Sequence, residues 1–292
     1  MKFRRFSFLF SVLLFGFSAG AQTALPVSEK ICELQDARIN ESSGLAASRK
    51  YSRRNLLITH NDSGGEASLF YINSKGQTVA EVSLKNASNL DWEDIAIAGK
   101  YIYVGDIGDN LRKRESITIY RLREPKFNPK KTRQKLEVSC EKMTLKYPDA
   151  PCDAETLMAT SQGEIVLVSK NGGASRFYKT PRAFEKNSAQ TLELIGEYAF
   201  KGESALSYLT TGGDLSENET RFIIRTYSHA YEWVLPPEKD WRQAITSTPF
   251  VWELPASKQG EAICYSADGE EYFVSSEGAP APIWKIEFAP VG

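Results

Sequence analysis

Three features of the sequence predict an all-β fold. Short runs rich in Ile, Val, Tyr, Phe and Thr recur between clusters of Gly, Asp, Asn and Ser, a pattern typical of strands joined by turns. No stretch keeps a helical period over three turns. Five segments also share one order of features, a polar or acidic start followed by three apolar runs with turns between them.

The five segments can be aligned on their starts and on the two apolar runs that follow each start. The starts are Glu41-Ser-Ser-Gly-Leu-Ala, Asp91-Trp-Glu-Asp-Ile-Ala, Asp153-Ala-Glu-Thr-Leu-Met, Glu203-Ser-Ala-Leu-Ser-Tyr and Gly260-Glu-Ala-Ile-Cys. The second runs begin at Leu56, Tyr101, Ile165, Phe222 and Tyr272, and the third runs at Leu69, Ile117, Arg176, Ala230 and Ile283. We expect each run to form one strand of a repeated unit.

A fourth candidate strand follows four of the five units, at 78–84, 135–145, 192–200 and 249–254. The fifth unit has none, but residues 30–34 near the N-terminus provide a matching strand. Four-stranded repeats of roughly 54 residues are typical of β-propeller blades. We therefore predict a five-bladed propeller that the N-terminal strand closes into a ring. A β-sandwich is one alternative, and a six-bladed ring with a degenerate blade between Pro181 and Glu203 or between Pro236 and Gln259 is another.

The first residues have the pattern of a signal peptide. Lys2, Arg4 and Arg5 precede an apolar run at 6–17, and Ala19-Gly20-Ala21 then provides small residues of the cleavage type. We expect residues 1–21 to be removed and residues 22–292 to form a single periplasmic or secreted propeller domain, monomeric and without a transmembrane segment.

The charge and cysteine counts exclude some classes of function. The chain has 36 Lys and Arg against 37 Asp and Glu, which gives no electrostatic reason to expect nucleic acid as a partner. The four cysteines are an even number, and of their three possible pairings we favour a disulfide between Cys140 and Cys152. No Cys-x-x-Cys or Cys/His spacing for structural zinc is present.

Propeller geometry predicts where the polar residues gather. Each innermost strand starts at the face to which the second strand of its blade returns, so residues before the first and after the second share one end of the central channel. The acids at the starts are Glu41, Asp91, Glu93, Asp94, Asp153, Glu155, Glu203 and Glu261. The residues after the second strands are His60, Asn61, Asp62, Asp106, Asp109, Asn110, Lys170, Asn171, Arg225, Tyr227, His229 and Glu277.

So many carboxylates around one axis would raise each other's pKa unless a cation lay among them. Because the ligands would all be oxygen atoms, calcium suits them better than zinc or copper. Other interpretations remain: Asn61-Asp62-Ser63-Gly64 and Gly108-Asp109-Asn110 can be ordinary Asx turns. The acids at the strand starts can also accept backbone N–H groups between blades, and Arg112-Lys113-Arg114 can be a solvated loop.

Four motifs resemble an uncharacterised family of exported bacterial propellers: His60-Asn-Asp-Ser-Gly, Asp91-Trp-Glu-Asp-Ile-Ala, Tyr103-Val-Gly-Asp-Ile-Gly-Asp-Asn and Arg225-Thr-Tyr. More distantly, the chain is similar to calcium-dependent propellers, namely the phytase-like, gluconolactonase and paraoxonase, and SdiA-regulated proteins. That likeness implies a metal at the channel mouth, with Glu41, Glu93, Glu155 and Glu261 as ligands. Those relatives mostly have six blades, whereas five are counted here, so their ligand geometry does not transfer.

We therefore expect a calcium-assisted hydrolase of a small anionic phosphoester or lactone. The expected ligands are a subset of Glu41, Asp91, Glu93, Asp94, Glu155 and Glu261, and His60 or Asp106 would accept a proton from water. The residues expected to bind the substrate are Lys170, Arg225, Tyr227 and His229. The alternative is a non-catalytic propeller with structural calcium that presents Tyr227, Tyr231 and Trp233 to an envelope partner.

Overall fold

The computed structural model describes residues 26–202 and 207–288. The segment predicted as a signal peptide and the predicted start at Glu203 lie outside the described residues. Within the described part, no helix is both long enough and apolar enough to cross a membrane.

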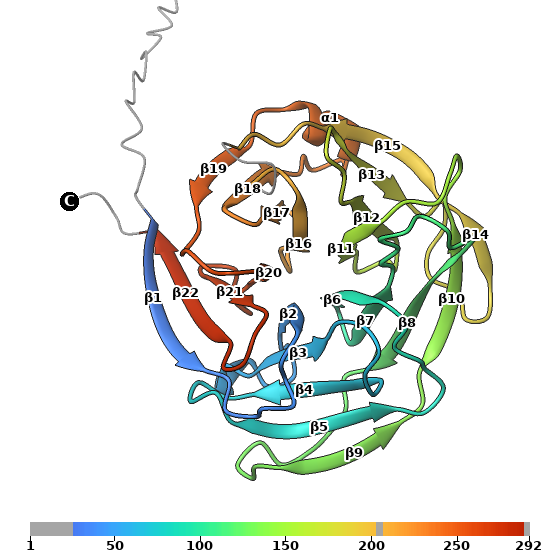
Figure 1. Ribbon diagram of the computed structural model, residues 1–292. Helices are drawn as coiled ribbons and strands as arrows, with labels where there is room; N and C mark the ends of the chain where they lie inside the picture. Colours follow the sequence, from blue (N-terminus) through green and yellow to red (C-terminus); the bar gives the residue numbers. More distant parts are fainter. Residues whose placement is uncertain (1–25, 203–206, 289–292) are drawn as a thin grey trace, which may run out of the picture.

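The strands form five sheets around a central axis, and the prediction of a five-bladed propeller is confirmed (Figure 1). The innermost strands β2, β6, β11, β16 and β20 surround the axis. Blade 1 contains β2 (Ser42–Ala47), β3 (Leu57–Asn61), β4 (Ser68–Ile72) and β5 (Thr78–Leu84). Blade 2 contains β6 (Trp92–Ala98), β7 (Tyr101–Asp106), β8 (Ile117–Arg123) and β10 (Glu141–Lys146).

The other three blades repeat this antiparallel order from the axis outward. Blade 3 contains β11 (Ala154–Ala159), β12 (Ile165–Ser169), β13 (Ser175–Lys179) and β15 (Glu193–Tyr198). Blade 4 contains β16 (Thr210–Leu215), β17 (Arg221–Thr226), β18 (His229–Val234) and β19 (Phe250–Glu253). Blade 5 contains β20 (Gly260–Tyr265), β21 (Tyr272–Ser276), β22 (Pro282–Phe288) and β1 (Pro26–Glu33).

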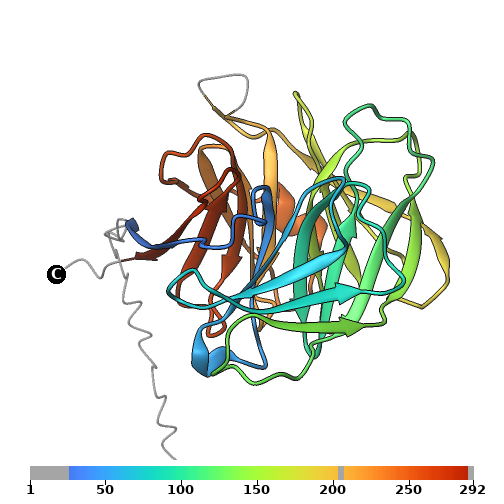
Figure 2. The same ribbon diagram turned by 60° about the horizontal axis from the view of Figure 1, so that its bottom comes forward.

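The N-terminal strand closes the ring, as the sequence predicts. Strand β1 pairs antiparallel with β22, the last strand of the described chain, from Pro26 opposite Phe288 to Glu33 opposite Pro282. Figures 1 and 2 show the two strands side by side at the outer edge of blade 5. Closure leaves the propeller without a gap between its first and last blades.

Two short parallel strands extend the outer edges of blades 1 and 2. Strand β9 (Gln134–Val138) pairs with β5 of blade 1, and β14 (Ala189–Thr191) pairs with β10 of blade 2. The single strand predicted at 135–145 is therefore wrong, because its first half crosses to the previous blade and only its second half forms β10. Each crossing covers a backbone edge that would otherwise be exposed.

In residues 26–202 and 207–288, helical structure is limited to two short elements. They are the 3-10 helix η1 (Ser52–Arg54) and the helix α1 (Trp241–Thr246). Helix α1 starts where the side chain of Asp240 accepts a hydrogen bond from the backbone N–H of Gln243, and its Trp241 is buried in the core between blades 3 and 4.

The hydrophobic core is divided into five clusters, one between each pair of neighbouring blades. This division explains why the predicted disulfide is wrong. Cys140 packs in the cluster between blades 1 and 2, whereas Cys152 packs against the cluster between blades 2 and 3. The two residues flank opposite ends of β10, and all four cysteines are free thiols.

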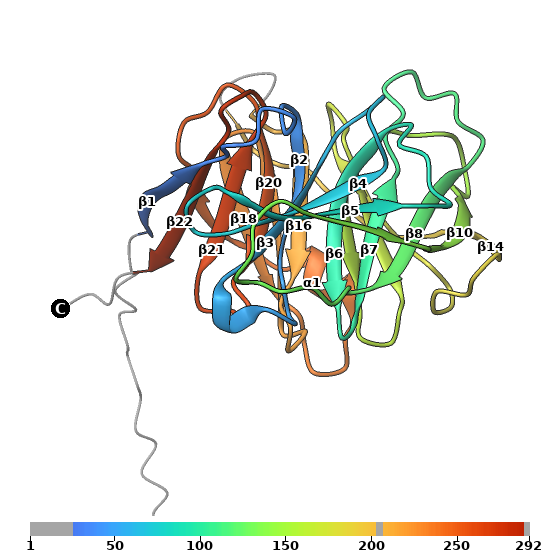
Figure 3. The same cartoon turned by 90° about the horizontal axis from the view of Figure 1, so that it is seen from below.

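The innermost strand of blade 4 also differs from the prediction. The sequence places its start at Glu203, but the strand is β16, the polar segment Thr210-Thr-Gly-Gly-Asp-Leu. All six residues of β16 are buried because β11, β20 and β17 pack around it. In Figure 3 the arrowheads of β6 and β16 point downward, so the starts of the innermost strands lie at the upper end.

Candidate functional site

A β-bulge at the start of each innermost strand determines which residues form the site. The register of β6 shifts between Trp92 and Asp94, so Glu93 has no partner on β7. The same shift leaves Glu155 unpaired in β11 and Glu261 unpaired in β20. Bulges turn a side chain out of the regular alternation of a strand, and they are frequent next to active sites. Three blades thus contribute a glutamate from one structural position.

The same position holds no acid in the other two blades. Thr211 occupies it in β16, and Ser43 lies within the corresponding shift in β2. The hydroxyl of Thr211 donates to the carbonyl of Gly260, and that of Ser43 donates to the carbonyl of Glu93. These two blades therefore hold their neighbours in place and supply no carboxylate at the bulge.

Three aspartates complete the acidic cluster around Glu93. Asp91 and Asp153 directly precede β6 and β11, and Asp62 directly follows β3. The carboxylates of Asp62, Asp91 and Glu93 offer oxygen atoms within 4.8 Å of one another, and so do those of Glu93, Asp153 and Glu155. The two groups share Glu93, so five acids from three blades form one continuous cluster.

Gly108 makes this close approach possible. The backbone N–H groups of Ile107 and Gly108 donate to the carbonyl of Asp91 at 3.1 and 3.2 Å, which places the loop after β7 against the cluster. A Cβ atom on residue 108 would lie 2.1 Å from Oε1 of Glu93 and 2.6 Å from Cγ of Asp91. Only glycine leaves room for both carboxylates.

Burial and mutual repulsion raise the pKa values of the clustered acids. The pKa of Glu93 lies well above its ordinary value because the side chain is buried and faces Glu155 and Asp62. Burial and the negative charge of Asp91 raise the pKa of Asp62 to about 7. Without a cation the folded protein can keep this cluster only at the cost of binding protons.

Lys170 provides the cluster with one internal positive charge. Its Nζ lies 2.8 Å from Oε1 of Glu155 and 5.3 Å from the centre of the Tyr227 ring. Burial alone would lower the pKa of Lys170, but the charges of Glu155 and Glu261 raise it above its ordinary value. One ammonium group does not balance five carboxylates, although the charges of Arg114 and Arg112 also act on Asp91 and Asp153, so an excess of negative charge remains unless the cluster binds protons or a cation.

Two buried oxygen atoms near the cluster lack partners in the described structure. They are Oδ1 of Asp62 and Oε2 of Glu261. Burial and the charge of Glu155 raise the pKa of Glu261 to about 8. A buried acceptor without a donor is costly, and a bound cation is one way to satisfy it.

The donors present fit a calcium ion. The cluster offers carboxylate oxygens alone, with no thiolate or imidazole in either group, and hard oxygen ligands of this kind are those that calcium prefers. The partnerless oxygen of Asp62 and the close packing on Gly108 are both consistent with a cation among these acids.

Comparisons with known proteins do not assign the chain to a family. No protein-family model matches it, and no curated protein matches it. Among solved structures, the fold is similar to that of a gluconolactonase from Xanthomonas campestris, with a TM-score of 0.44 and 9% sequence identity over 88% of this chain and 91% of that chain. At this low similarity, the likeness says nothing about the site of this chain.

Asp94 lies in the same strand as Glu93 but has a different role. Its Oδ1 accepts the backbone N–H of Ile95 at 2.8 Å, and its Oδ2 accepts those of Leu157 at 2.9 Å and Gly213 at 3.3 Å. The side chain is completely buried. It joins β6 to β11 and β16, as in the interpretation that some acids link the blades.

The two residues expected to act as bases are buried, and each has at least one described polar partner. His60 is completely buried, with Nδ1 3.0 Å from the carbonyl oxygen of Asn61, and burial lowers its pKa to about 4. Asp106 is buried too, and its Oδ1 accepts from Arg114 at 2.6 Å. Neither side chain belongs to the acidic cluster.

The remaining predicted residues lie on the same end of the propeller in different environments. Arg225 is buried, and its guanidinium donates to the carbonyls of Ala262 at 2.7 Å and Ser275 at 2.9 Å. His229 is half-buried, with Nδ1 2.8 Å from Oγ of Ser228. Glu41 is half-buried beside Asp62, and its charge contributes to the raised pKa of that residue.

The sequence pattern placed Asp62 and Asp153 at this end of the channel but not among the expected ligands, and it gave no role to Gly108. Both aspartates stand at strand ends on the correct face, and a backbone bond shared by four blades identifies these ends. The residue after the second strand donates to the residue before the first, as Asp62 does to Glu41 and Lys170 to Asp153. This pairing can be read from an alignment of the repeats. The contact of Gly108 with Glu93 cannot, because it depends on the folded loop.

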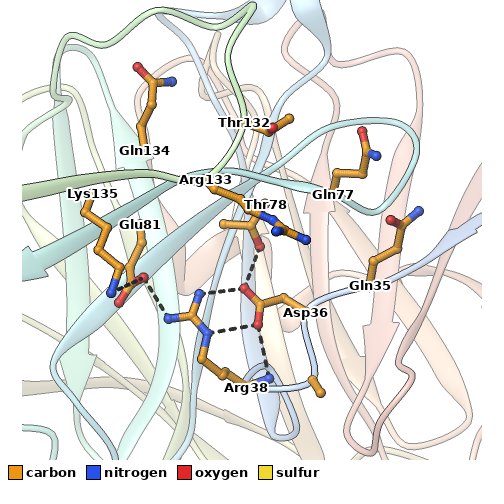
Figure 4. Close-up of a pocket in the computed structure, with 11 residues that line it drawn as sticks. Gln35, Asp36, Arg38, Gln77, Thr78, Glu81, Thr132, Arg133, Gln134 and Lys135 are labelled. Atoms are coloured by element: carbon orange, nitrogen blue, oxygen red, sulfur yellow. Dashed lines mark hydrogen bonds and ion pairs between the residues drawn. The ribbon is translucent and has the colours of Figure 1, made fainter.

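A pocket of about 580 Å³ lies away from the acidic cluster, on the outer side of blade 1. Figure 4 shows that Asp36, Arg38, Thr78 and Glu81 point toward one another in it, and Arg133 also lines the pocket. Arg38 pairs with Asp36 at 2.7 Å and with Glu81 at 2.8 Å. Because these charges satisfy one another, the group ties the segment before β2 to the outer strands of blade 1.

Proposed function

We propose that the protein binds one calcium ion at the channel mouth and hydrolyses a phosphoester or lactone of a small anionic molecule there. The observation that carries the proposal is the continuous cluster of Asp62, Asp91, Glu93, Asp153 and Glu155, which three blades bring together in a largely buried place. The charge of this cluster is far from balanced by Lys170.

The residues of the site would have three different roles, namely binding the ion, positioning a ligand and accepting a proton. The five acids hold the ion, which supplies polarisation of the carbonyl or phosphoryl oxygen of the substrate. Lys170 fixes the carboxylate of Glu155 and adds a positive charge beside the site. Glu261 lies nearby with a partnerless oxygen, and because a bound cation beside it would favour its ionised form, its carboxylate can accept a proton.

In the proposed hydrolysis, water is the nucleophile and the alcohol or the opened hydroxyl group is the leaving group. The oxygen of water forms a bond to the carbonyl carbon or to phosphorus, and the ester C–O or P–O bond breaks. One proton of the water passes to the carboxylate of Glu261 and from there to the leaving oxygen. The resident groups of the chain are unchanged at the end of the cycle.

Calcium binding is tested with a variant of the residue that both carboxylate groups share. We expect Glu93→Gln to weaken calcium binding in isothermal titration calorimetry by about 10-fold or more, because calcium affinity depends on the number of charged ligands and even changes to the groups around the ligands cost about 10- to 100-fold. The matched control is Glu253→Gln, which changes an exposed carboxylate on the outer strand of blade 4. Equal affinity in the wild type and Glu93→Gln, or no calcium binding at all, would contradict the proposed site.

Catalysis is tested separately by screening phosphoesters and lactones with calcium and with a chelator. Activity that the chelator abolishes and Glu93→Gln reduces supports the hydrolase. Calcium binding without turnover of any substrate would instead indicate the non-catalytic binding propeller.

A further inference from the structure

A small pocket lined by positive charges adjoins the acidic cluster between blades 2 and 3. Its volume is about 190 Å³. Its polar and charged lining residues are Arg112, Cys152, Ser169, Lys170, Asn171 and Arg176. Three of the residues that line it are cationic and none is acidic, although it lies beside five carboxylates.

Of these cations, Arg112 has the least compensated charge. Lys170 pairs with Glu155, and Arg176 pairs with Asp149 at 2.6 Å. The guanidinium of Arg112 has one long hydrogen bond, from Nη2 to Oδ1 of Asn171 at 3.5 Å, and no ion pair among the described residues. Since a guanidinium carries five N–H donors in a planar fork, most of its donors are free to bind a ligand.

The loop that carries Arg112 is fixed to the acidic cluster. The backbone N–H of Asp109 donates to Oδ1 of Asp153 at 2.8 Å. The N–H of Arg112 donates to the carbonyl of Asp109 at 2.7 Å, and the carboxylate of Asp109 accepts the N–H groups of Lys113 and Arg114. Burial raises the pKa of Asp153 above its ordinary value, and the nearby charge of Arg112 offsets a small part of that rise. The pocket and the cluster are therefore two parts of one rigid surface.

We propose that this pocket binds a second anionic group of the substrate, a carboxylate or a phosphate, while the ester to be cleaved lies at the acidic cluster. The inference rests on the proposed function and specifies its substrate class. The pocket is smaller than the roughly 300–1,000 Å³ usual for a whole small molecule, so it fits one group of a larger substrate. Arg112 is the residue that determines specificity for that group, because a planar fork matches the oxygens of either anion.

Two thiols of the chain provide an internal comparison for occupancy of the pocket. Cys152 lines the pocket and Cys32 lies on blade 5, and both are half-buried. Burial raises the pKa of each thiol to about 11, so the two start from similar fractions of thiolate. We expect inorganic phosphate to slow the alkylation of Cys152 by iodoacetamide and to leave Cys32 unchanged, at an ionic strength matched with sodium chloride. Peptide mass spectrometry measures both rates.

Variants of Arg112 decide whether the guanidinium is responsible. We expect Arg112→Gln to weaken phosphate binding, measured by the protection of Cys152, by about 10- to 100-fold, as loss of a charge-assisted hydrogen bond predicts. Arg112→Lys should restore part of the protection because it keeps the charge and loses the fork. Arg182→Gln, at an exposed arginine outside the pocket, is the control and should behave as the wild type.

Succinate in place of phosphate distinguishes the two anions, because the stronger protectant of Cys152 identifies the group that the substrate carries. Equal slowing of Cys32 and Cys152, or full protection in Arg112→Gln, overturns the subsite. These measurements do not need calcium. Protection that persists in chelated protein supports the subsite even if hydrolysis fails, and calcium-dependent turnover with no change in Arg112→Gln overturns the subsite alone.

Discussion

At the scale of single residues, the site depends on one glycine as much as on its acids. Glu93 lies at a bulge, Asp91 precedes the strand, and Gly108 lets both carboxylates rest against the backbone of the following loop. Any side chain at residue 108 would occupy the space of the carboxylate oxygens. The geometry of the proposed ligands is therefore set partly by a residue that cannot bind a metal itself.

Gly108→Ala should reduce calcium affinity without unfolding the propeller. The added methyl group displaces the carboxylates of Glu93 and Asp91, and we expect about 10-fold weaker binding in titration calorimetry, because a residue that orients metal ligands affects affinity to this extent. Gly173→Ala is the matched control, since a Cβ atom there has no neighbour within 4 Å. Equal calcium affinity in both variants would show that these two acids are not ligands.

The sequence predicted the acids of the site better than the contacts between them. Glu93, Glu155 and Glu261 were found because they recur at one place in an aligned repeat. Sequence order could not show that Asp94, the neighbour of Glu93, accepts N–H groups from two other blades. The cysteine prediction failed for a similar reason, because a short loop between Cys140 and Cys152 does not show that each thiol packs in a different core.

At the scale of strands, buried carboxylates link the innermost strands to one another. Asp94 of β6 accepts N–H groups from β11 and β16, and Asp214 of β16 accepts that of Tyr265 in β20 at 3.0 Å. The innermost strands of different blades do not pair as a ladder in the described sheets. These side chains therefore supply hydrogen bonds across the axis that the sheets do not provide.

Asp94→Ala should destabilise the protein clearly. The change leaves the N–H groups of Leu157 and Gly213 without an acceptor, at about 1–3 kcal/mol each. We expect the melting temperature in calorimetry to fall by roughly 5–15 °C, given about 2–4 °C per kcal/mol for a chain of this size. Asp94→Asn keeps one acceptor oxygen, so its melting temperature should lie between those of the wild type and Asp94→Ala. An unchanged melting temperature in Asp94→Ala would show that Asp94 does not stabilise the contacts between blades.

The strands also show where sequence patterns stop being informative. Strands β7 and β12 were found because they are continuous apolar runs. The polar strand β16 was missed because its burial comes from the blades around it. The crossing of β9 was missed as well, since a parallel pairing with β5 depends on a chain segment from the previous blade.

At the scale of the whole molecule, the acidic cluster should make stability depend on pH when calcium is absent. The folded pKa values of Glu261 and Asp62 are raised to about 8 and about 7, above the values of the unfolded chain. Between the two sets of values the folded chain binds more protons than the unfolded chain. The free energy of unfolding therefore falls as the pH rises through this window.

Metal-free protein should accordingly melt at a higher temperature near about pH 5.5 than near about pH 8. Saturating calcium should raise the melting temperature most at the higher pH, because an ion that binds only the folded state adds RT ln(1 + [L]/Kd). Scanning calorimetry at both pH values, with chelator and with calcium, measures the four temperatures. A chelated protein that is more stable at the higher pH would contradict the assignment of these buried acids.

The pairing of β1 with β22 also bears on how the chain is made. Synthesis proceeds from the N-terminus, so β1 leaves the ribosome before any other described strand and must wait for the last one to find its partner. Chains interrupted before residue 282 would expose one edge of β1 and one edge of β21, and quality-control proteases could recognise them. Only a chain that has been synthesised as far as Phe288 can therefore form the complete pairing of β1 with β22 that closes the ring.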